Sequence, residues 1–201
     1  LVGAGGHAKV AADILLQNQD YEIAGIVDEQ AESGFWGIPV VGRDADLASV
    51  RQELGIAYAF AALGDGRLRE KVTKKVLAAG YELINVISAS ARISERALLG
   101  QGIAVMPGAV INADVRIADG CIINTNASVD HDGVIGEFTH IAPGTAVSGY
   151  VTVGRQCLLG TGSRVIDRIT IGDNVTAGAG SVIIRNINGN CTVVGVPAKR
   201  I

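Results

Sequence analysis

A branched aliphatic residue recurs at every sixth position in the C-terminal half of this chain, and this spacing constrains the fold more than any other feature. The series runs without an insertion, and all sixteen positions except Ala177 are branched aliphatics: Ile93, Leu99, Val105, Ile111, Ile117, Ile123, Val129, Ile135, Ile141, Val147, Val153, Leu159, Val165, Ile171, Ala177 and Ile183. Six is a multiple of the two-residue strand period but not of the helical period of about 3.6 residues, so an amphipathic helix cannot produce it. Each hexad therefore predicts a short strand followed by a turn.

The residues around this repeat indicate the shape of the unit that it builds. A small or aliphatic side chain stands two positions before each member of the repeat, as at Ala109, Val115 and Cys121. A glycine often stands directly after the member, at Gly100, Gly136, Gly154, Gly160, Gly172 and Gly178. Three strands close one coil of 18 residues, so side chains 18 apart stack about 4.8 Å apart in a parallel β-helix prism. On this register Cys121 and Cys157 lie two coils apart, too far for a disulfide.

Residues 1 to 87 follow a different pattern, in which short apolar strands alternate with amphipathic helices. Val2 ends a first strand, and further strands are predicted over residues 21–28, 57–63 and 81–87, with helices over 8–17 and 67–79. This alternation is typical of a parallel sheet with helices packed on it, here about half the size of a full dinucleotide-binding fold. We therefore expect a Rossmann-like α/β domain over residues 1–87 and an all-β prism over residues 88–201.

Charge and composition exclude several classes of function. With 17 Lys and Arg against 20 Asp and Glu, the net charge of -3 offers no basic surface for nucleic acid. No apolar run reaches the roughly 18–20 residues that cross a bilayer, and the three cysteines follow no CxxC spacing. We expect a cytoplasmic protein, and the abrupt start at Leu1, within a strand, is consistent with an excised domain of a longer bifunctional chain.

The glycine-rich turn Gly3-Ala4-Gly5-Gly6-His7-Ala8, between the first strand and the first helix, matches the pattern GxGxxA. Bare N–H groups at a helix N-terminus can hold a phosphate, and Asp28, at the end of the second strand, can accept from ribose or sugar hydroxyls. Gly64-Asp65-Gly66 follows the third strand at the same edge of the sheet. The pattern fits a nicotinamide-dinucleotide oxidoreductase, a nucleotide-sugar site or a turn that only packs helix on strand. The lack of a second mononucleotide half favours the nucleotide sugar.

Two of the three histidines lie in the prism, nine residues apart. His131 stands at a turn with Asp132 beside it, and an imidazole whose tautomer is set by a carboxylate can act as a general base. Gly149 lies 18 residues later in the same turn column, where its bare N–H can face a developing oxyanion. His140 directly precedes an inward residue and so points outward. Taken alone, either histidine could be a surface side chain, and a zinc site of three histidines would lack its third ligand in the prism.

Five segments give the sequence a specific resemblance: GAGGHAKV at the start, WGIPVVG, the run from Asn124 to Asp132, IGEFTHIAPG and the closing VVGVPAKRI. Over essentially the whole chain they resemble the hexapeptide-repeat nucleotide-aminosugar acetyltransferases. These include the sialic acid O-acetyltransferase-like proteins and the bacillosamine-pathway N-acetyltransferases. The resemblance implies a left-handed β-helix, a homotrimer with the site shared between subunits, acetyl-CoA as co-substrate and no metal.

Matched residue by residue, the resemblance also implies the site. His131 is the base and Asp132 raises its basicity, where bacillosamine-type members often have Glu. Contacts to acetyl-CoA come from His140, Gly149, Thr161 and Ala179, of which the last two lie one coil apart in one turn column. The nucleotide sugar is bound by Gly5, Gly6, His7, Asp28, Glu29 and Gly64, with Asn124 as a further candidate for the sugar.

We therefore predict an acetyltransferase that moves the acetyl group of acetyl-CoA to the 4-amino group of a UDP-linked 4-amino-4,6-dideoxy-N-acetylhexosamine. The amine attacks the thioester directly, with His131 as general base. O-acetylation of a sugar hydroxyl, and N-acetylation of another nucleotide amino sugar such as GDP-perosamine, stay open at this point. In a third interpretation the prism only trimerises a nucleotide-sugar-binding α/β domain and catalyses nothing.

Overall fold

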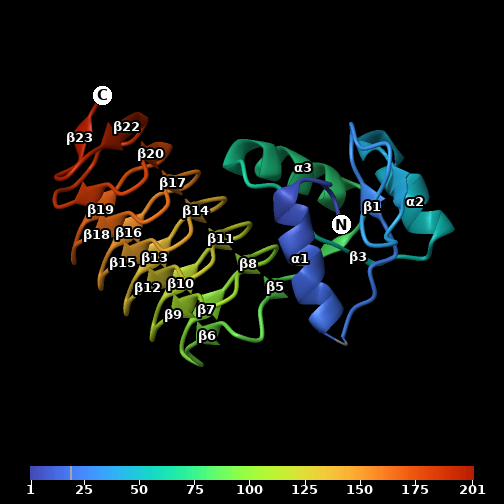
Figure 1. Cartoon of the computed structure of the whole chain (residues 1–201), viewed down its shortest axis with the longest axis horizontal. Helices are drawn as coiled ribbons and strands as arrows, with labels where there is room; N and C mark the ends of the chain where they lie inside the picture. The colour runs from blue at the N-terminus through green and yellow to red at the C-terminus, as the bar shows by residue number, and fades with distance from the viewer. Residues whose placement is uncertain (19) are drawn as a thin grey trace. The chain divides into compact units, whose positions relative to one another are not determined.

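The chain forms two compact units, Leu1–Val86 and Ile87–Ile201. The computed structural model describes residues 1–18 and 20–201. Figure 1 shows the first unit as helices around short strands and the second as a stack of coils.

The first unit is built on a parallel sheet. Its strands are β1 (Ile26–Val27), β2 (Val40–Gly42), β3 (Tyr58–Ala59) and β4 (Glu82–Leu83). Val2 bridges Val27 on one side and Ala61 on the other, both in parallel, while β1 pairs with β2 and β3 with β4. The spatial order is therefore β2, β1, the Val2 segment, β3, β4. This is the order of one half of a doubly wound sheet, with the Val2 segment at its centre.

Three α-helices accompany this sheet: α1 (Gly6–Gln17), α2 (Leu47–Glu53) and α3 (Gly66–Ala78), with a 3-10 turn, η1, over Asp44–Asp46. The helix α1 buries Ala8, Ala11, Ala12, Ile14 and Leu15. Both β2 and α2 were absent from the sequence prediction. Among the described residues, no helix is long and apolar enough to cross a bilayer.

Two predicted strands are corrected by the structure. The strand expected over residues 21–28 is confined to Ile26–Val27. The strand expected over residues 81–87 is two strands, β4 and β5 (Val86–Ile87), because β4 pairs with β3 whereas β5 is the end strand of a sheet of the prism. One apolar run thus serves two different sheets, and periodicity alone cannot locate the break.

The second unit is a parallel β-helix whose short strands form three sheets. The strands are β6 (Arg92–Ile93), β7 (Leu98–Leu99), β8 (Ala104–Val105), β9 (Val110–Ile111), β10 (Arg116–Ile117), β11 (Ile122–Ile123), β12 (Ser128–Val129), β13 (Val134–Ile135), β14 (His140–Ile141), β15 (Ala146–Val147), β16 (Thr152–Val153), β17 (Leu158–Leu159), β18 (Arg164–Val165), β19 (Thr170–Ile171), β20 (Val175–Ala177), β21 (Val182–Ile183), β22 (Cys191–Val194) and β23 (Lys199–Arg200). From β6 to β18, each strand pairs with the strand three places on, as Arg116 does with Val134, which confirms the predicted 18-residue register. The core is the predicted column of branched aliphatics.

The register changes at the C-terminal end of the prism. Val175 pairs with Cys191, 16 residues later instead of 18, and β22 then pairs antiparallel with β23. Because the last coil is two residues shorter than the others, side chains after β21 do not stack on the residues 18 positions before them.

From residue 102 to residue 180, each corner of the prism contains one residue in the left-handed backbone region. Positive φ angles recur at every sixth position: Gly102, Gly108, Asp114, Gly120, Asn126, Asp132, Phe138, Gly144, Tyr150, Gln156, Gly162, Arg168, Asn174 and Gly180. The glycines noted in the sequence lie two residues earlier and have another cause. A Cβ on Gly136, for example, would lie 2.6 Å from the carbonyl carbon of Gly154 in the next coil. Those glycines therefore allow neighbouring coils to approach closely.

Small polar side chains inside the prism satisfy carbonyl groups of the following corner, 15 residues on. The pairs are Cys121 with Gly136 (3.0 Å), Thr139 with Gly154 (2.7 Å), Thr145 with Gly160 (3.0 Å), Cys157 with Gly172 (3.1 Å) and Ser163 with Gly178 (3.2 Å). The two inward cysteines are free thiols, and burial raises the pKa of the Cys157 thiol. Buried polar groups are tolerated when they are paired in this way.

Ser181 occupies the next step of this series, but its buried hydroxyl has no hydrogen-bond partner among the described residues. The partner expected from the series would be the carbonyl of residue 196, and the two-residue deletion in the last turn has moved that segment out of register.

These two serines give a matched stability test. Ser163→Ala should lower the free energy of unfolding by about 1 kcal/mol, because it removes a buried hydroxyl that donates to the carbonyls of Gly160 and Gly178. Ser181→Ala should be neutral or stabilising, because it removes an unpaired buried hydroxyl. Denaturant unfolding of both variants measures the difference. Equal losses in the two would contradict this account of the inward hydrogen bonds.

Candidate active site

The corner after β12 places His131 and Asp132 on successive turn residues. The corner is fixed by backbone bonds along the prism axis: the Asp132 N–H donates to the Ala113 carbonyl (3.1 Å), and the Tyr150 N–H donates to the His131 carbonyl (3.0 Å). Asp132 is the left-handed residue of this corner, with φ of 57°. Asp tolerates this conformation better than most residues with a side chain.

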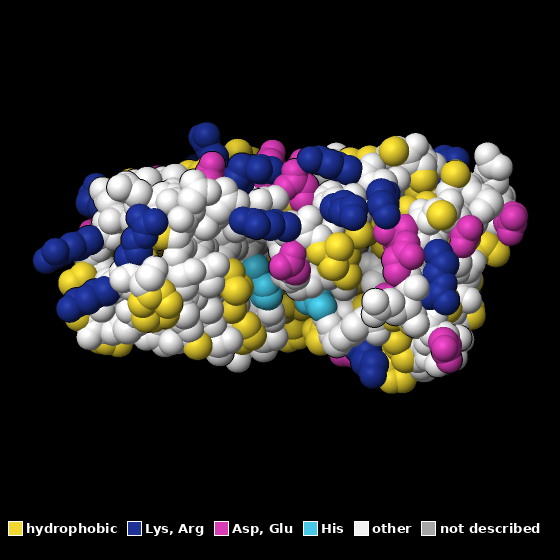
Figure 2. All heavy atoms as spheres, turned by 90° about the horizontal axis from the view of Figure 1, so that it is seen from above, with side chains coloured by type: hydrophobic (Ala, Val, Ile, Leu, Met, Phe, Trp, Pro, Cys, Tyr) yellow, Lys and Arg dark blue, Asp and Glu magenta, His cyan; other side chains and the backbone are white. Residues whose placement is uncertain are grey.

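His131 and Asp132 form a hydrogen-bonded pair. Nδ1 of His131 lies 2.9 Å from Oδ2 of Asp132, and the side chains are 51% and 41% exposed. Because the carboxylate is an acceptor, Nδ1 carries the proton and Nε2 is left as the basic nitrogen. The pKa of His131 is raised, chiefly by the hydrogen bond to Asp132. Histidine side chains reach the surface on the face shown in Figure 2.

Asp130 supports the same corner from the preceding residue. One oxygen, Oδ1, accepts both the backbone N–H of His131 (2.8 Å) and the side-chain amide of Asn112 in the coil below (2.9 Å). These bonds lower the pKa of Asp130, so its charge is retained beside the imidazole. Asp130 was not identified from the sequence, although it stands one coil above Asn112 and the 18-residue register predicts that contact.

Gly149 packs directly against the imidazole from the coil above. A Cβ on this residue would lie 2.6 Å from Cε1 and 2.7 Å from Nε2 of His131, so a larger residue here would displace the ring. None of the hydrogen bonds within residues 1–18 and 20–201 uses the Gly149 N–H. The structure therefore brings His131, predicted to be the base, into contact with Gly149, predicted to face the oxyanion.

Asn124 and His140 also form one unit. Oδ1 of Asn124 accepts the N–H of Thr125 (2.7 Å), which leaves Nδ2 of Asn124 to donate to Nε2 of His140 (2.9 Å). The sequence placed Asn124 with the sugar and His140 with acetyl-CoA. The hydrogen bond links the two side chains and makes Nε2 of His140 an acceptor. Both ligand assignments stay predictions.

Thr161 and Ala179 stack one coil apart, as the turn column predicts. The N–H of Gly180 donates to the Thr161 carbonyl (2.8 Å), and both residues are exposed. Within the described part of the chain, no hydrogen bond uses the N–H groups of Thr161 and Ala179. Two parallel backbone donors are therefore available at this corner.

In the α/β unit, Gly5 and Gly6 lie where α1 begins. Gly5 is the N-cap residue of this helix, and a Cβ on either glycine would meet nothing within 4 Å. His7 follows in the first turn and is half-buried. The open helix N-terminus suits a phosphate group.

Asp28 has a structural role that the sequence did not predict. Its carboxylate accepts the N–H groups of Ala4 (2.8 Å), Gln30 (2.9 Å) and Ala31 (2.8 Å). Although burial acts to raise the pKa of Asp28, these backbone bonds lower it. Asp28 therefore clamps the glycine-rich turn to the end of β1.

Glu29 and Gly64 are likewise tied to neighbouring loops. Oε1 of Glu29 accepts the N–H of Asp44 (3.2 Å), and the Gly64 carbonyl accepts from the buried Arg69 guanidinium (2.9 Å). Together with Asp28, they shape the carboxyl edge of the sheet. Their predicted contacts with the nucleotide sugar stay a prediction.

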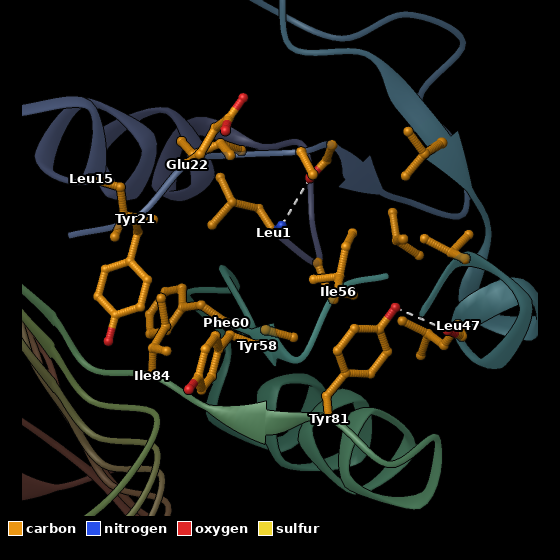
Figure 3. A pocket seen from close by; sticks show the side chains of 18 of the residues that line it. Leu1, Leu15, Tyr21, Glu22, Leu47, Ile56, Tyr58, Phe60, Tyr81 and Ile84 are labelled. Carbon is orange, nitrogen blue, oxygen red and sulfur yellow. Dashed lines mark hydrogen bonds between the residues drawn. The ribbon is translucent and has the colours of Figure 1, made fainter. Parts of the chain in front are cut away.

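A cavity of about 270 Å³ lies in the α/β unit, shown in Figure 3. Its lining includes residues that precede or open the strands, namely Gly25 before β1, Ile56 before β3 and Tyr81 before β4. It is therefore at the amino edge of the sheet, whereas ligands of open α/β sheets bind at the carboxyl edge. This cavity is not a candidate for the nucleotide-sugar site. Among the described residues, no three His, Cys, Asp or Glu side chains are grouped as metal ligands.

Comparison with known proteins agrees with this geometry. A family model described as the PglD N-terminal domain matches residues 1–76. PerB from Caulobacter crescentus, solved with CoA and GDP-perosamine, is 44% identical, with a TM-score of 0.94 over 100% of this chain and 95% of that one. The acetyltransferase domain of PglB from Neisseria gonorrhoeae FA1090, solved with acetyl coenzyme A, is 38% identical, with a TM-score of 0.94 over 100% and 97%.

Curated relatives match over shorter stretches. A serine acetyltransferase from Synechococcus elongatus is 30% identical over 105 residues, which is 51% of this chain and 39% of that protein. An uncharacterised protein of Acanthamoeba polyphaga mimivirus is 36% identical over 120 residues, or 59% of this chain and 23% of that protein. The matches thus span less than half the length of these curated relatives.

A hexad prism with a histidine–carboxylate pair at its corner, joined to a small α/β unit, defines a left-handed β-helix acyltransferase. More narrowly, the chain belongs to the hexapeptide-repeat family of acetyl-CoA-dependent sugar N-acetyltransferases, which confirms the resemblance seen in the sequence.

The pair at the corner can be tested by titration. Asp132→Asn keeps the corner, because Asn126 and Asn174 adopt the same conformation with φ of 56° and 55°. It should lower the pKa of His131, because the charged acceptor that stabilises the imidazolium is lost. NMR titration of the His131 ring measures this. Asp114→Asn, one coil below, is the control and should leave the titration unchanged. An unchanged or higher pKa in Asp132→Asn would disprove the role of the pair.

Proposed function

We propose that this chain transfers the acetyl group of acetyl-CoA to the 4-amino group of a nucleotide-linked 4-amino-4,6-dideoxyhexose, with His131 as general base. The observation that carries this proposal is the hydrogen-bonded His131–Asp132 pair at a prism corner, with Gly149 against the imidazole. An unprotonated Nε2 beside a backbone N–H is the arrangement that amine acylation requires.

The chemistry needs one proton acceptor and one oxyanion donor. The amine nitrogen attacks the thioester carbonyl carbon while Nε2 of His131 removes a proton from the nitrogen. The Gly149 N–H stabilises the negative charge that develops on the carbonyl oxygen. When the tetrahedral intermediate collapses, the carbon–sulfur bond breaks and His131 returns the proton to the departing CoA thiolate. No covalent enzyme intermediate is involved, so neither Ser nor Cys is needed as a nucleophile.

Other residues of the prism are assigned to acetyl-CoA. The exposed N–H groups of Thr161 and Ala179 suit amide carbonyls of the pantetheine arm. Asn124 donates to Nε2 of His140, so the Nδ1–H of His140 is the group that can donate to the cofactor. We assign nucleotide-sugar binding to the α/β unit, where the helix N-terminus at Gly5 and Gly6 favours phosphate and the loops of Asp28, Glu29 and Gly64 form the edge. Trimer formation, which the resemblance implies, stays a prediction.

The nucleotide can be UDP, as the sequence predicts, or GDP. PerB, whose solved complex contains GDP-perosamine, is 44% identical to this chain, and the PglB domain is 38% identical. The likeness to PerB supports GDP, and the resemblance seen in the sequence supports UDP. The proposal includes both nucleotides, because in either case the acceptor is the amino group of the sugar.

A substrate panel tests the acceptor. Thiol release from acetyl-CoA should be observed with GDP- or UDP-linked 4-amino-4,6-dideoxy sugars and should be at background with the matching 4-hydroxy sugars. An amine is a far stronger nucleophile toward a thioester than a hydroxyl is. The single base at this site is therefore enough for N-acetylation but not for O-acetylation. Release with the 4-hydroxy sugars alone would favour O-acetylation. No release with any sugar, together with no acetyl-CoA binding in calorimetry, would support the scaffold interpretation.

Replacement of the base tests the mechanism. His131→Ala should lower kcat by roughly 100-fold or more, because general-base assistance is lost, while acetyl-CoA affinity stays nearly unchanged. For the unmodified protein, kcat/KM should rise with pH, since only the neutral imidazole accepts a proton. The midpoint of that rise should lie above the ordinary histidine value of 6.5. Near-normal turnover of His131→Ala would remove His131 from the mechanism.

A further inference from the structure

The corner that carries His131 continues along the prism as a stack of side chains. Tyr150 stands one coil above Asp132 and Arg168 one coil above Tyr150, with φ of 57° and 58°. The rings of His131 and Tyr150 have centroids 5.2 Å apart and are nearly perpendicular, at 87°. The Arg168 guanidinium carbon lies 4.5 Å from the centroid of the Tyr150 ring.

These contacts hold the imidazole on three sides. Asp132 accepts the hydrogen bond from Nδ1, Gly149 lies against Cε1 and Nε2, and Tyr150 makes the perpendicular ring contact. The hydrogen bond alone permits the imidazole to swing about its own Nδ1. A second contact on another part of the ring removes that freedom and fixes the direction of Nε2.

Core packing does not account for Tyr150. Phe138, another aromatic residue at a left-handed corner, is buried, with 7% of its surface exposed. Tyr150 is 47% exposed, and its ring contacts are with the imidazole and the guanidinium. A bulky residue in this conformation costs energy relative to Gly or Asn. The exposed position leaves the contact with His131 as the feature that explains the ring.

We propose that Tyr150 and Arg168 are positioning residues for His131: Tyr150 orients the imidazole, and Arg168 holds Tyr150 in place while its charge acts on the base. This inference rests on the proposed function of His131. Neither residue needs to touch a substrate, and neither was identified as part of the site from the sequence.

The charges around His131 show what Arg168 adds. The hydrogen bond to Asp132 raises the pKa of His131 most, burial lowers it, the charges of Asp130 and Asp132 raise it further, and the charge of Arg168 lowers it. Arg168 is itself 3.7 Å from the carboxylate of Asp167. A base must be neutral to act, so the cation keeps more of His131 in its working form near neutral pH than the two carboxylates alone would allow.

The prism offers conservative replacements for the test. Tyr150→Phe keeps the ring and removes the hydroxyl. Tyr150→Asn removes the ring but suits the corner, as Asn126 and Asn174 do, and Arg168→Gln removes the charge at a position whose counterpart, Gln156, has φ of 53°. Gln156→Asn, at a corner of another column, is the matched control.

Steady-state kinetics across pH, and NMR titration of His131, are measured for each variant. Tyr150→Asn should lower kcat about ten-fold with the KM for acetyl-CoA unchanged, whereas Tyr150→Phe and Gln156→Asn should stay within about two-fold of the parent. Arg168→Gln should shift the rise of kcat/KM, and the His131 titration, to higher pH.

Each outcome decides a separate point. A loss in Tyr150→Phe as large as in Tyr150→Asn would overturn the inference, because the hydroxyl and not the ring would then matter. Unchanged kcat in Tyr150→Asn would overturn the orienting role, and an unshifted pH profile in Arg168→Gln would overturn the role of the charge. If His131→Ala retains turnover, the assignment of His131 as general base fails, and this inference fails with it. If His131→Ala is inactive while Tyr150→Asn is unaffected, only this inference fails.

Discussion

The hydrogen bonds between successive coils of the prism are the constraint on which everything else depends. They set an 18-residue register without slippage from β6 to β21, so the position of a side chain in sequence fixes its neighbours in space. His131 meets Gly149 because they are 18 residues apart, and Asn112 meets Asp130 for the same reason. A shift of one residue would turn inward aliphatics outward and separate every one of these contacts.

Corners suit catalysis because they combine two features that strands lack. The first turn residue can keep an N–H that no hydrogen bond among the described residues uses, as at Gly149, and the second is held in the left-handed region. At the His131 corner, this second residue is Asp132, whose short carboxylate reaches back to Nδ1. The pair therefore needs no loop beyond the ordinary turn, and the rigid coils preorganise it.

The sequence predicts the parts of this structure that follow from periodicity. The hexads specify the prism, its register and the stacking of Thr161 under Ala179. Periodicity could not locate the break between β4 and β5, because the same apolar run fits both sheets. It also could not predict the backbone N–H groups that the Asp28 carboxylate accepts, since side-chain direction in a loop is not periodic.

The register did contain signals that sequence reasoning missed. Tyr150 and Arg168 follow Asp132 at steps of 18, so their stacking at one corner was implied once the prism was accepted. The contact between Asn124 and His140 was harder to foresee. Their separation of 16 residues joins a corner residue to a strand residue of the next coil, and only the side-chain geometry shows that they meet.

The same geometry separates stability from activity in this fold. The prism is held by inward aliphatics and by inward hydroxyls and thiols paired with carbonyls, whereas the side chains of His131 and Asp132 are about half exposed and bury little apolar surface. Replacing these two should therefore cost the fold little, provided that the left-handed corner at residue 132 is kept. A loss of turnover in a variant of His131 or Asp132 can thus be attributed to the chemical step. A loss in a Ser163 variant could instead result from a less stable fold, because the Ser163 hydroxyl is part of the inward hydrogen bonding.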